Sequence, residues 1–344
     1  MSRVAVVLLN LGGPDRPEAI EPFLFNLFND RAIIALPQPL RWLIARLIAR
    51  RRAPVAQAIY RRIGGRSPLL ANTEAQARSL EAVLGEGFRV FIAMRYWPPL
   101  SEDTAAAVAA WQPDEIVLLP LYPQASTTTT ASSLAAWRRA AAKAGLAAPA
   151  RALCCYPEAA GFIAALAQAT REALERWPKG EKVRVLLSAH GLPRKIVAAG
   201  DPYPWQVERT AAALRQALAW PGLDSVICYQ SRVGPLAWIG PATDDEIRRA
   251  GREGIGLIVV PVAFVSEHSE TLVELDIDYR HVAEKAGVPR YFRVATVGTA
   301  AAFIAALAVL ARDAKEGPCP AGGARLCPPA LVGCLCAGAS EVAA

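Results

Sequence analysis

Short runs of aliphatic and β-branched residues alternate with longer alanine-rich stretches along most of the chain. This alternation is typical of parallel βαβ units, in which strands buried on both faces read as continuous apolar runs. The apolar runs predict strands at residues 4–10, 89–96, 115–122, 152–156, 182–188, 225–230, 256–264 and 291–297. Stretches with helical spacing lie between them, among them 132–144, 162–176 and 206–219.

The predicted strands fall into two sets of four. The sequence therefore predicts an α/β fold of two similar halves, each a four-stranded parallel sheet flanked by helices, dividing near Arg151. A polar residue followed by glycine and proline ends the first strand of each half, in Asn10-Leu-Gly-Gly-Pro and His190-Gly-Leu-Pro. Open α/β sheets bind ligands at the carboxyl ends of their strands. We therefore expect the functional site in a cleft between the halves.

The length of 344 residues suits two domains of ordinary size. We expect residues 1–150 to form the first half, completed by a helix at 299–314, and residues 151–298 to form the second. Residues 315–344 are rich in cysteine, glycine and proline and form a separate tail in this interpretation.

Composition narrows the class of protein further. Apolar residues make up 53% of the chain and charged residues 20%, which excludes a disordered chain. Seven cysteines make a poor disulfide framework and favour a reducing, cytoplasmic compartment. The longest apolar stretch, residues 300–311, is too short to span a bilayer, and the first residues read as a strand rather than a signal peptide. The net charge of +7 suits an anionic ligand or lipid surface as well as nucleic acid.

Residues 40–52, LRWLIARLIARRR, combine apolar positions at helical spacing with five arginines. A basic amphipathic helix of this kind can lie in a membrane interface. The same pattern also fits an ordinary surface helix with its apolar face on the core. Both interpretations stay open at this point.

Two groups of residues could carry chemistry at the strand ends. His190 follows an apolar strand, where a neutral imidazole could bind a metal or accept a proton, or could simply fix a loop. After the strand at 256–264, we expect Ser266 to cap a helix whose one face carries an acidic stripe of Glu267, Glu270, Glu274 and Asp278. Such a stripe could carry a divalent cation or protons, or be a solvated helix face.

The tail holds a third candidate site. Cys327, Cys334 and Cys336 lie in a segment with little to bury, so they are poor candidates for core residues. With Cys154 or Cys155 as a fourth thiolate they could hold zinc or an iron–sulfur cluster, and an inert tail is the alternative. Cys228 lies in mid-strand and is expected in the core.

Several motifs together resemble those of ferrochelatases, which insert ferrous iron into a porphyrin to make haem. They are LLNLGGPD (8–15), YRRIGGRSPL (60–69), AMRYWPP (93–99), LPLYPQ (119–124), LLSAHGLP (186–193), GDPYP (200–204), YQSRVGPLAWIGP (229–241) and SEHSETLVELD (266–276). The resemblance implies two Rossmann-like halves with a porphyrin cleft between them. It implies a lyase whose substrates are Fe(II) and a porphyrin, with protoporphyrin IX as the expected one, and no nucleotide.

Residue roles follow from the same resemblance. His190 and Glu270 match the catalytic pair, and metal handling is implied for His190, Glu270, Glu267 and Glu274. Matching porphyrin-binding positions are Leu11, Leu27, Arg52, Tyr60, Ser67, Arg95, Tyr96, Tyr122, Trp238 and Phe264. The tail spacing looks like that of family members with a 2Fe–2S cluster, here held by Cys327, Cys334, Cys336 and either Cys154 or Cys155.

Rival functions stay in view. A coproporphyrin or cobalt chelatase is the nearest alternative, and a non-catalytic tetrapyrrole-binding protein is an alternative of another class. The acidic stripe argues against the latter, because a binder of an anionic porphyrin gains nothing from added carboxylates. Expected partners are porphyrin and ferrous iron, with no nucleic acid, and peripheral membrane contact through 40–52 stays one of two open interpretations of that helix. The expected location is the cytoplasm, peripherally on the inner face of the membrane, as a monomer or a homodimer.

Overall fold

The computed structural model describes residues 2–232, 234, 236–314 and 325–336. Contacts within the chain divide it into two compact units. Unit 1 comprises Met1–Tyr156, Leu307–Pro329 and Gly333–Ala344, and unit 2 comprises Pro157–Ala306 and Ala330–Val332. Within the described residues, no helix has the length and apolarity needed to cross a membrane.

Unit 1 is built on a parallel sheet with the order β2-β1-β3-β4. Its strands are β1 (Val4–Asn10), β2 (Phe88–Met94), β3 (Glu115–Pro120) and β4 (Ala150–Ala152). The central strand β1 is buried along its whole length, which explains its continuous apolar sequence. Its helices are α1 (Ile20–Phe28), α2 (Leu40–Arg61), α3 (Leu69–Leu84), α4 (Ser101–Trp111) and α5 (Thr130–Lys143), after a 3₁₀ turn at Pro17–Ala19.

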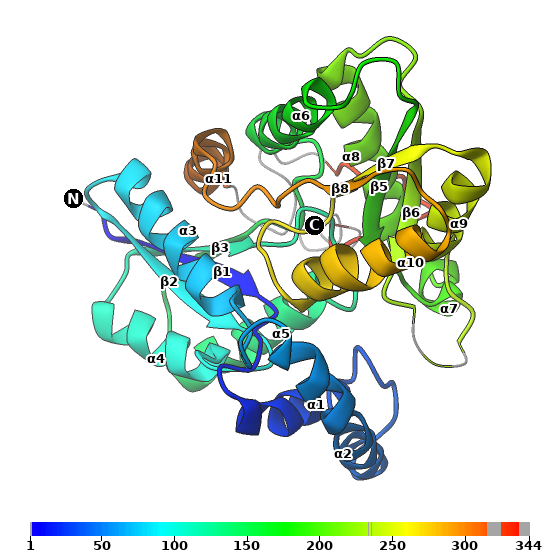
Figure 1. Ribbon diagram of the computed structural model, residues 1–344. Helices are drawn as coiled ribbons and strands as arrows, with labels where there is room; N and C mark the ends of the chain where they lie inside the picture. The colour runs from blue at the N-terminus through cyan, green and yellow to red at the C-terminus, as the bar shows by residue number, and fades with distance from the viewer. Residues whose placement is uncertain (1, 233, 235, 315–324, 337–344) are drawn as a thin grey trace. The chain divides into compact units, whose positions relative to one another are not determined.

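Unit 2 repeats this topology, with a parallel sheet in the order β6-β5-β7-β8. Its strands are β5 (Val183–His190), β6 (Ser225–Gln230), β7 (Gly256–Pro261) and β8 (Tyr291–Arg293). Its helices are α6 (Ala160–Glu175), α7 (Arg194–Ala198), α8 (Tyr203–Leu218), α9 (Thr243–Glu253), the π-helix η2 (Glu270–Asp278) and α10 (Tyr279–Lys285) (Figure 1). The last helix, α11 (Ala301–Asp313), has residues in both units.

Each unit has a core that fixes the elements near its strand ends. In unit 1, Leu134 and Trp137 of α5 pack with Val7 and Leu118 of the sheet. In unit 2, Leu275 of η2 packs in a cluster that also contains residues of β7, α9 and α10: Leu257, Val259, Ile247, Ala250 and Ala283. The π-helix that carries the acidic residues is therefore seated on the sheet by an apolar side chain.

The predicted α/β fold of two four-stranded parallel sheets is confirmed, and several element ends differ. The strand expected at 152–156 is wrong, because β4 covers Ala150–Ala152 and pairs with β3 only over Ile116–Leu118. The strands expected to end at 264 and 297 end at Pro261 and Arg293. The helix expected at 40–52 runs on to Arg61, through Pro54, with small alanines on its buried side.

Candidate active site

His190 ends β5, a strand whose preceding residues are almost entirely buried, and its side chain is 37% exposed. Its Nδ1 lies 2.6 Å from the backbone oxygen of Gly191. A carbonyl can only accept, so this contact places a proton on Nδ1 and leaves the Nε2 lone pair free in the neutral ring. Nε2 lies 3.6 Å from Oε1 of Glu270. The imidazole therefore presents a base beside a carboxylate.

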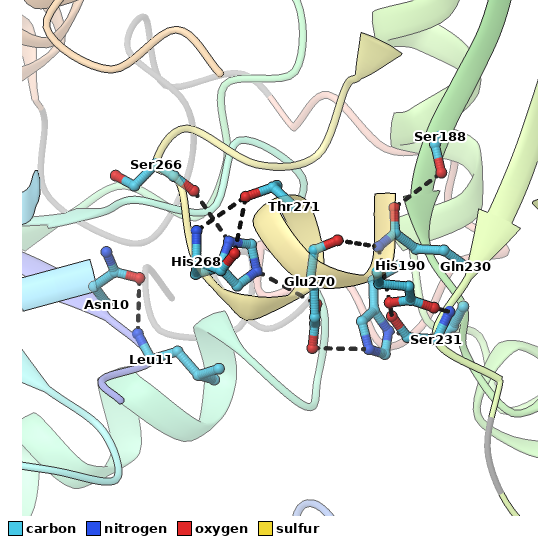
Figure 2. A network of polar contacts seen from close by, with 12 residues as sticks. Asn10, Leu11, Ser188, His190, Gln230, Ser231, Ser266, His268, Glu270 and Thr271 are labelled. Carbon is cyan, nitrogen blue, oxygen red and sulfur yellow. Dashed lines mark hydrogen bonds and ion pairs between the residues drawn. The ribbon is translucent and has the colours of Figure 1, made fainter. Parts of the chain in front are cut away.

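Glu270 lies between two histidines (Figure 2). Its Oε2 is 3.4 Å from Nε2 of His268, whose Nδ1 is 3.1 Å from the backbone oxygen of Ser266. Burial alone would raise the pKa of Glu270, but the two histidines outweigh it and lower the pKa to about 2. Burial lowers the pKa of His268, and the bond and charge of Glu270 overcome this and raise it. Glu270 is thus a fixed negative charge.

Glu274 lies one turn further along η2, in a ring of donors. Its Oε1 accepts from the backbone N–H of Ser231 at 2.7 Å and the hydroxyl of Tyr279 at 3.0 Å. Its Oε2 accepts from the Gln230 amide at 3.1 Å and from the Ser231 hydroxyl. Burial and the charge of Glu270 raise the pKa of Glu274, against the bonds from Ser231. Two neighbouring carboxylates therefore differ in their readiness to hold a proton.

Two expectations for this segment are wrong. Ser266 caps no helix, since η2 begins only at Glu270, and Thr271 instead exchanges hydrogen bonds with His268. Glu267 accordingly precedes the helix and lies outside the expected stripe. Its carboxylate accepts from Arg293 at 2.7 Å and from the backbone N–H of Thr296 at 2.9 Å. Arg293 comes from β8, so no short-range pattern could reveal this competing partner.

The other predicted residues of unit 2 lie near the histidines. The rings of Phe264 and His268 meet edge to face, with centroids 4.6 Å apart. Trp238 packs over Gly191, where an added Cβ would be 3.2 Å from the indole ring, and its carbonyl accepts from Arg194. Sequence reasoning gave no role to His268, although it stands between two acidic residues of a motif already noted.

In unit 1, most predicted porphyrin-binding residues gather in one cluster. Leu11, Leu27, Tyr60 and Tyr96 share an apolar group, and the guanidinium of Arg52 lies 5.9 Å from the ring centre of Phe28 in the same group. Ser67 donates its backbone N–H to the backbone oxygen of Pro14 at 2.7 Å.

Arg95 is held by a buried carboxylate that sequence reasoning missed. Its Nη2 donates to Asp30 at 2.7 Å, and its Nε donates to the Ser132 hydroxyl at 2.7 Å. Asp30 also accepts from Tyr96 at 2.8 Å and from Ser132. Burial and the Asp30 charge raise the pKa of Tyr96 far above its usual range, so its hydroxyl stays a donor. Tyr122 reaches the Ser133 hydroxyl at 3.4 Å.

The cysteines of unit 1 form a chain of sulfur contacts. Cys154 lies 3.4 Å from Cys336 and 3.2 Å from Cys155. Hydrogen bonds from Cys327 and Cys336 lower the pKa of Cys334, which favours its thiolate. Within the part of the chain that the structure describes, no three histidine, cysteine or acidic side chains are grouped to hold one metal ion. Cys228 is buried in β6, as expected.

Comparison with solved structures defines the fold as that of a chelatase. SirB from Bacillus subtilis with Fe3+ covers 90% of this chain and 95% of its own at a TM-score of 0.52 and 13% identity. The sirohydrochlorin chelatase SirB from Bacillus subtilis subspecies spizizenii in complex with cobalt has a TM-score of 0.53 and 11% identity, covering 90% of this chain and 94% of its own. At such identities the likeness concerns the fold alone.

The sequence comparisons then specify the family. The ferrochelatase family model matches residues 3–315. The ferrochelatase of Phenylobacterium zucineum is 55% identical over 341 residues, covering 97% of this chain and 98% of its own. That of Hyphomonas neptunium is 48% identical over 344 residues, covering 96% and 94%. This chain belongs to the ferrochelatase family.

Proposed function

We propose that this chain is a lyase that inserts Fe(II) into a porphyrin, protoporphyrin IX, and releases two protons. Family membership supports the reaction. The observation that carries the site assignment is the pair formed by His190 and Glu270, with Nε2 3.6 Å from Oε1. Removal of a pyrrole proton requires a base, and binding of a metal cation requires a negative charge. The imidazole and the carboxylate of this pair supply both.

In this mechanism His190 accepts a pyrrole proton at Nε2. Its Nδ1–H stays on the Gly191 carbonyl, so the ring orientation is unchanged by protonation. The electron pair of the broken N–H bond stays on the pyrrole nitrogen, which then binds iron. Glu270 stabilises the imidazolium as a carboxylate. The proton then leaves to solvent from His190, whose side chain is 37% exposed, and the neutral ring takes the second pyrrole proton in the same way.

Metal binding by His190 is the alternative to proton acceptance, because Nε2 can hold a proton or Fe(II) but not both at once. Of the acidic residues, Glu270 is the one best placed to share the metal with it. Borderline-soft Fe(II) suits an imidazole nitrogen together with a carboxylate oxygen. Glu274 has donors on both oxygens, and Glu267 is bound to Arg293, so both would need rearrangement before binding a cation.

Arg95 is the residue of unit 1 that we assign to an anionic edge of the porphyrin. It is pre-oriented by Asp30 and Ser132, which reduces the ordering cost of binding a carboxylate. The apolar lining is assigned to Leu11, Leu27, Tyr60, Tyr96, Tyr122, Trp238 and Phe264, with Arg52 and Ser67 as further contacts.

Anaerobic assay with ferrous iron and protoporphyrin IX tests the function directly. We expect haem formation with the native chain and its loss in His190→Ala, with porphyrin binding by fluorescence quenching retained. Haem formation by His190→Ala at the native rate would contradict the site. Parallel assays with coproporphyrin and with Co²⁺ separate the related chelatases, and binding without turnover would identify a carrier.

We also propose a 2Fe–2S cluster held by Cys154, Cys327, Cys334 and Cys336. The four thiols fit such a group, because they are buried, in one chain of sulfur contacts, and two thiolates per iron are needed. A bound cluster would supply a cross-link between the tail and the segment after β4. Cys155 contacts Cys154, whereas Cys154 itself reaches Cys336, which favours Cys154 as the ligand. Anaerobic visible spectra should lose charge-transfer bands in Cys154→Ser and keep them in Cys155→Ser; retained bands in Cys154→Ser would reject the choice.

A further proposal concerns the membrane. Leu40, Leu43 and Leu47 of α2 are 47%, 60% and 64% exposed, and arginines follow them on the same helix. Such a helix suits the inner, anionic face of a membrane. Flotation with vesicles of anionic phospholipid should fall in Leu43→Ser/Leu47→Ser and stay unchanged in a control, Val83→Ser of α3. Equal flotation of both variants would reject the proposal.

A further inference from the structure

Gln230 is the last residue of β6 and is completely buried. Across the ladder it lies opposite His190, the last residue of β5. Its backbone oxygen accepts the N–H of Gly191 at 2.8 Å, so it anchors the turn that follows His190. An added Cβ on Gly191 would lie 2.9 Å from this oxygen, which shows how closely the two segments approach.

The side chain of Gln230 reaches the π-helix. Its amide nitrogen donates to the backbone oxygen of Glu270 at 3.0 Å (Figure 2). It also donates to Oε2 of Glu274 at 3.1 Å. Its amide oxygen accepts from the hydroxyl of Ser188 at 2.9 Å, and Ser188 is paired with Thr243 at 3.2 Å. The backbone oxygen of Glu270 and the carboxylate of Glu274 accept hydrogen bonds, so the amide nitrogen must face them and the amide oxygen must face Ser188.

We propose that Gln230 is a positioning residue of the metal-insertion site, whose amide holds the backbone of Glu270 and the carboxylate of Glu274 in register with His190. The inference rests on the proposed function. The buried side chain of Gln230 is hydrogen-bonded to η2, which carries both Glu270 and Glu274. Its backbone oxygen is hydrogen-bonded to the turn that follows His190. A shift of about 1 Å between such groups costs about 100-fold in rate.

The Gln230 amide joins the backbone of Glu270 to the carboxylate of Glu274, whose Oε2 it shares with the Ser231 hydroxyl. Ser188 and Thr243 are also completely buried, so the network is closed to solvent. Titratable groups surround Glu274, which the amide contacts: Glu270 on the same helix, His190 from β5, Tyr279 from α10 and, beyond Tyr279, Asp244 from α9. Only a neutral donor can satisfy two acceptors here without adding charge.

Gln230→Met tests the inference, because methionine keeps the volume and removes both hydrogen-bonding ends. We expect kcat to fall by about 10- to 100-fold, the effect typical of residues that orient catalytic or metal-binding groups. The KM for porphyrin should change by less than about twofold, since no porphyrin-lining residue is touched. Ser188→Ala should show the same pattern more weakly. Thr170→Val, which removes a buried hydroxyl from α6 of the same unit, should retain native kcat.

The pH dependence of kcat in Gln230→Glu distinguishes a hydrogen-bonding role from a purely packing role, which would leave it unchanged. The new carboxyl can donate to Glu274 only while it is protonated. The ratio of native to variant kcat should therefore rise with pH, as the new group ionises beside two acids. The Gln230→Met deficit should persist at low pH, whereas Gln230→Glu should recover part of the native activity there, because its protonated carboxyl has one O–H and restores one of the two hydrogen bonds.

The positioning role of Gln230 and the proposed function can be refuted independently. If His190→Ala is inactive while Gln230→Met keeps kcat within about twofold of native, the positioning role is wrong and the proposed function stands. A pH-independent ratio for Gln230→Glu would also overturn the positioning role. If His190→Ala is fully active, the assignment of the site itself is wrong.

Discussion

Replacing Asp30 by asparagine should destabilise unit 1 in a pH-dependent way. One carboxylate oxygen accepts from Arg95, Tyr96 and Ser132, and the other accepts the backbone N–H of Ala32 at 2.9 Å. An asparagine offers one acceptor oxygen, so either the three donors or the Ala32 N–H must face an amide NH₂.

The magnitude follows from the loss of charge. A hydrogen bond to an ionised group contributes roughly 1 kcal/mol more than a neutral one, so three such bonds amount to about 3 kcal/mol. Because the pair with Arg95 is largely buried, solvent does not compensate. The free energy of unfolding at pH 7 should fall by about this amount, and the midpoint temperature by about 6–12 °C.

The pH dependence gives the sharper test. Burial raises the pKa of Asp30, but bonds from Ser132 and Ala32 and the charge of Arg95 outweigh it and lower the pKa. A lowered pKa stabilises the fold above the ordinary Asp range and loses this effect as the pH falls through the folded value. Urea unfolding should therefore show the difference between native and Asp30→Asn chains at pH 7 and its decline below about pH 4.

A matched control is Asp114→Asn, an exposed aspartate of the same unit that accepts from the backbone of Arg3. It should change the free energy of unfolding by less than about 0.5 kcal/mol. The reasoning about Asp30 is refuted if its variant equals the control at pH 7, or if its deficit grows on acidification.

Two further substitutions test unit 2. Arg293→Met should lower the free energy of unfolding by about 3 kcal/mol, because it leaves Glu267 and Asp276 without their common cation. The control is Arg290→Met, whose partner Glu181 is exposed. A similar loss of stability in the control would contradict the explanation. Gly161→Ala should lower the free energy of unfolding, measured with a chemical denaturant, by about 1–3 kcal/mol, because its Cβ would lie 2.1 Å from the backbone oxygen of Ala302. In the control Gly180→Ala the added Cβ meets no neighbouring atom within 4 Å, so this variant tests only the backbone conformation. An unchanged midpoint for Gly161→Ala would show that α6 and α11 can separate freely there.

The fold was predictable where burial dominates the sequence. β1 and β7 are buried on both faces, so their apolar runs located them well. β4 and β8 have three residues each at the edge of their sheets, and no local pattern distinguishes paired from unpaired residues there. The division into 1–150, 151–298 and a tail at 315–344 stays a prediction, and most of that tail lies outside the described residues.

The site was predictable at the level of strand ends and no further. His190 and Glu270, 80 positions apart in the sequence, are within 3.6 Å, as the rule on carboxyl ends suggests. The π-helix was missed, because apolar spacing at α-helical period does not reveal one extra residue per turn. Asp30 and Gln230 were missed because the hydrogen-bond partners that define their roles lie on elements distant in the sequence.

The two units share one sheet topology but carry groups of different charge near the ends of their strands. β1, β2 and β3 of unit 1 correspond in sheet order to β5, β6 and β7 of unit 2. After β2 stands Arg95, and after β3 comes α5 with Ser132, so this unit offers a cation and hydroxyls at its strand ends. In unit 2, His190 ends β5 and the carboxylates of η2 follow β7, so this unit offers a base and anions. These groups follow strands that are not counterparts, since β2 corresponds to β6. A cation at the strand ends of one unit and anions at those of the other nevertheless fit the two reactants of the proposed function, an anionic ring edge and a metal cation. Because the topology is shared, the difference arises from the residues that follow each strand, and substitution there should change one binding function without altering either sheet.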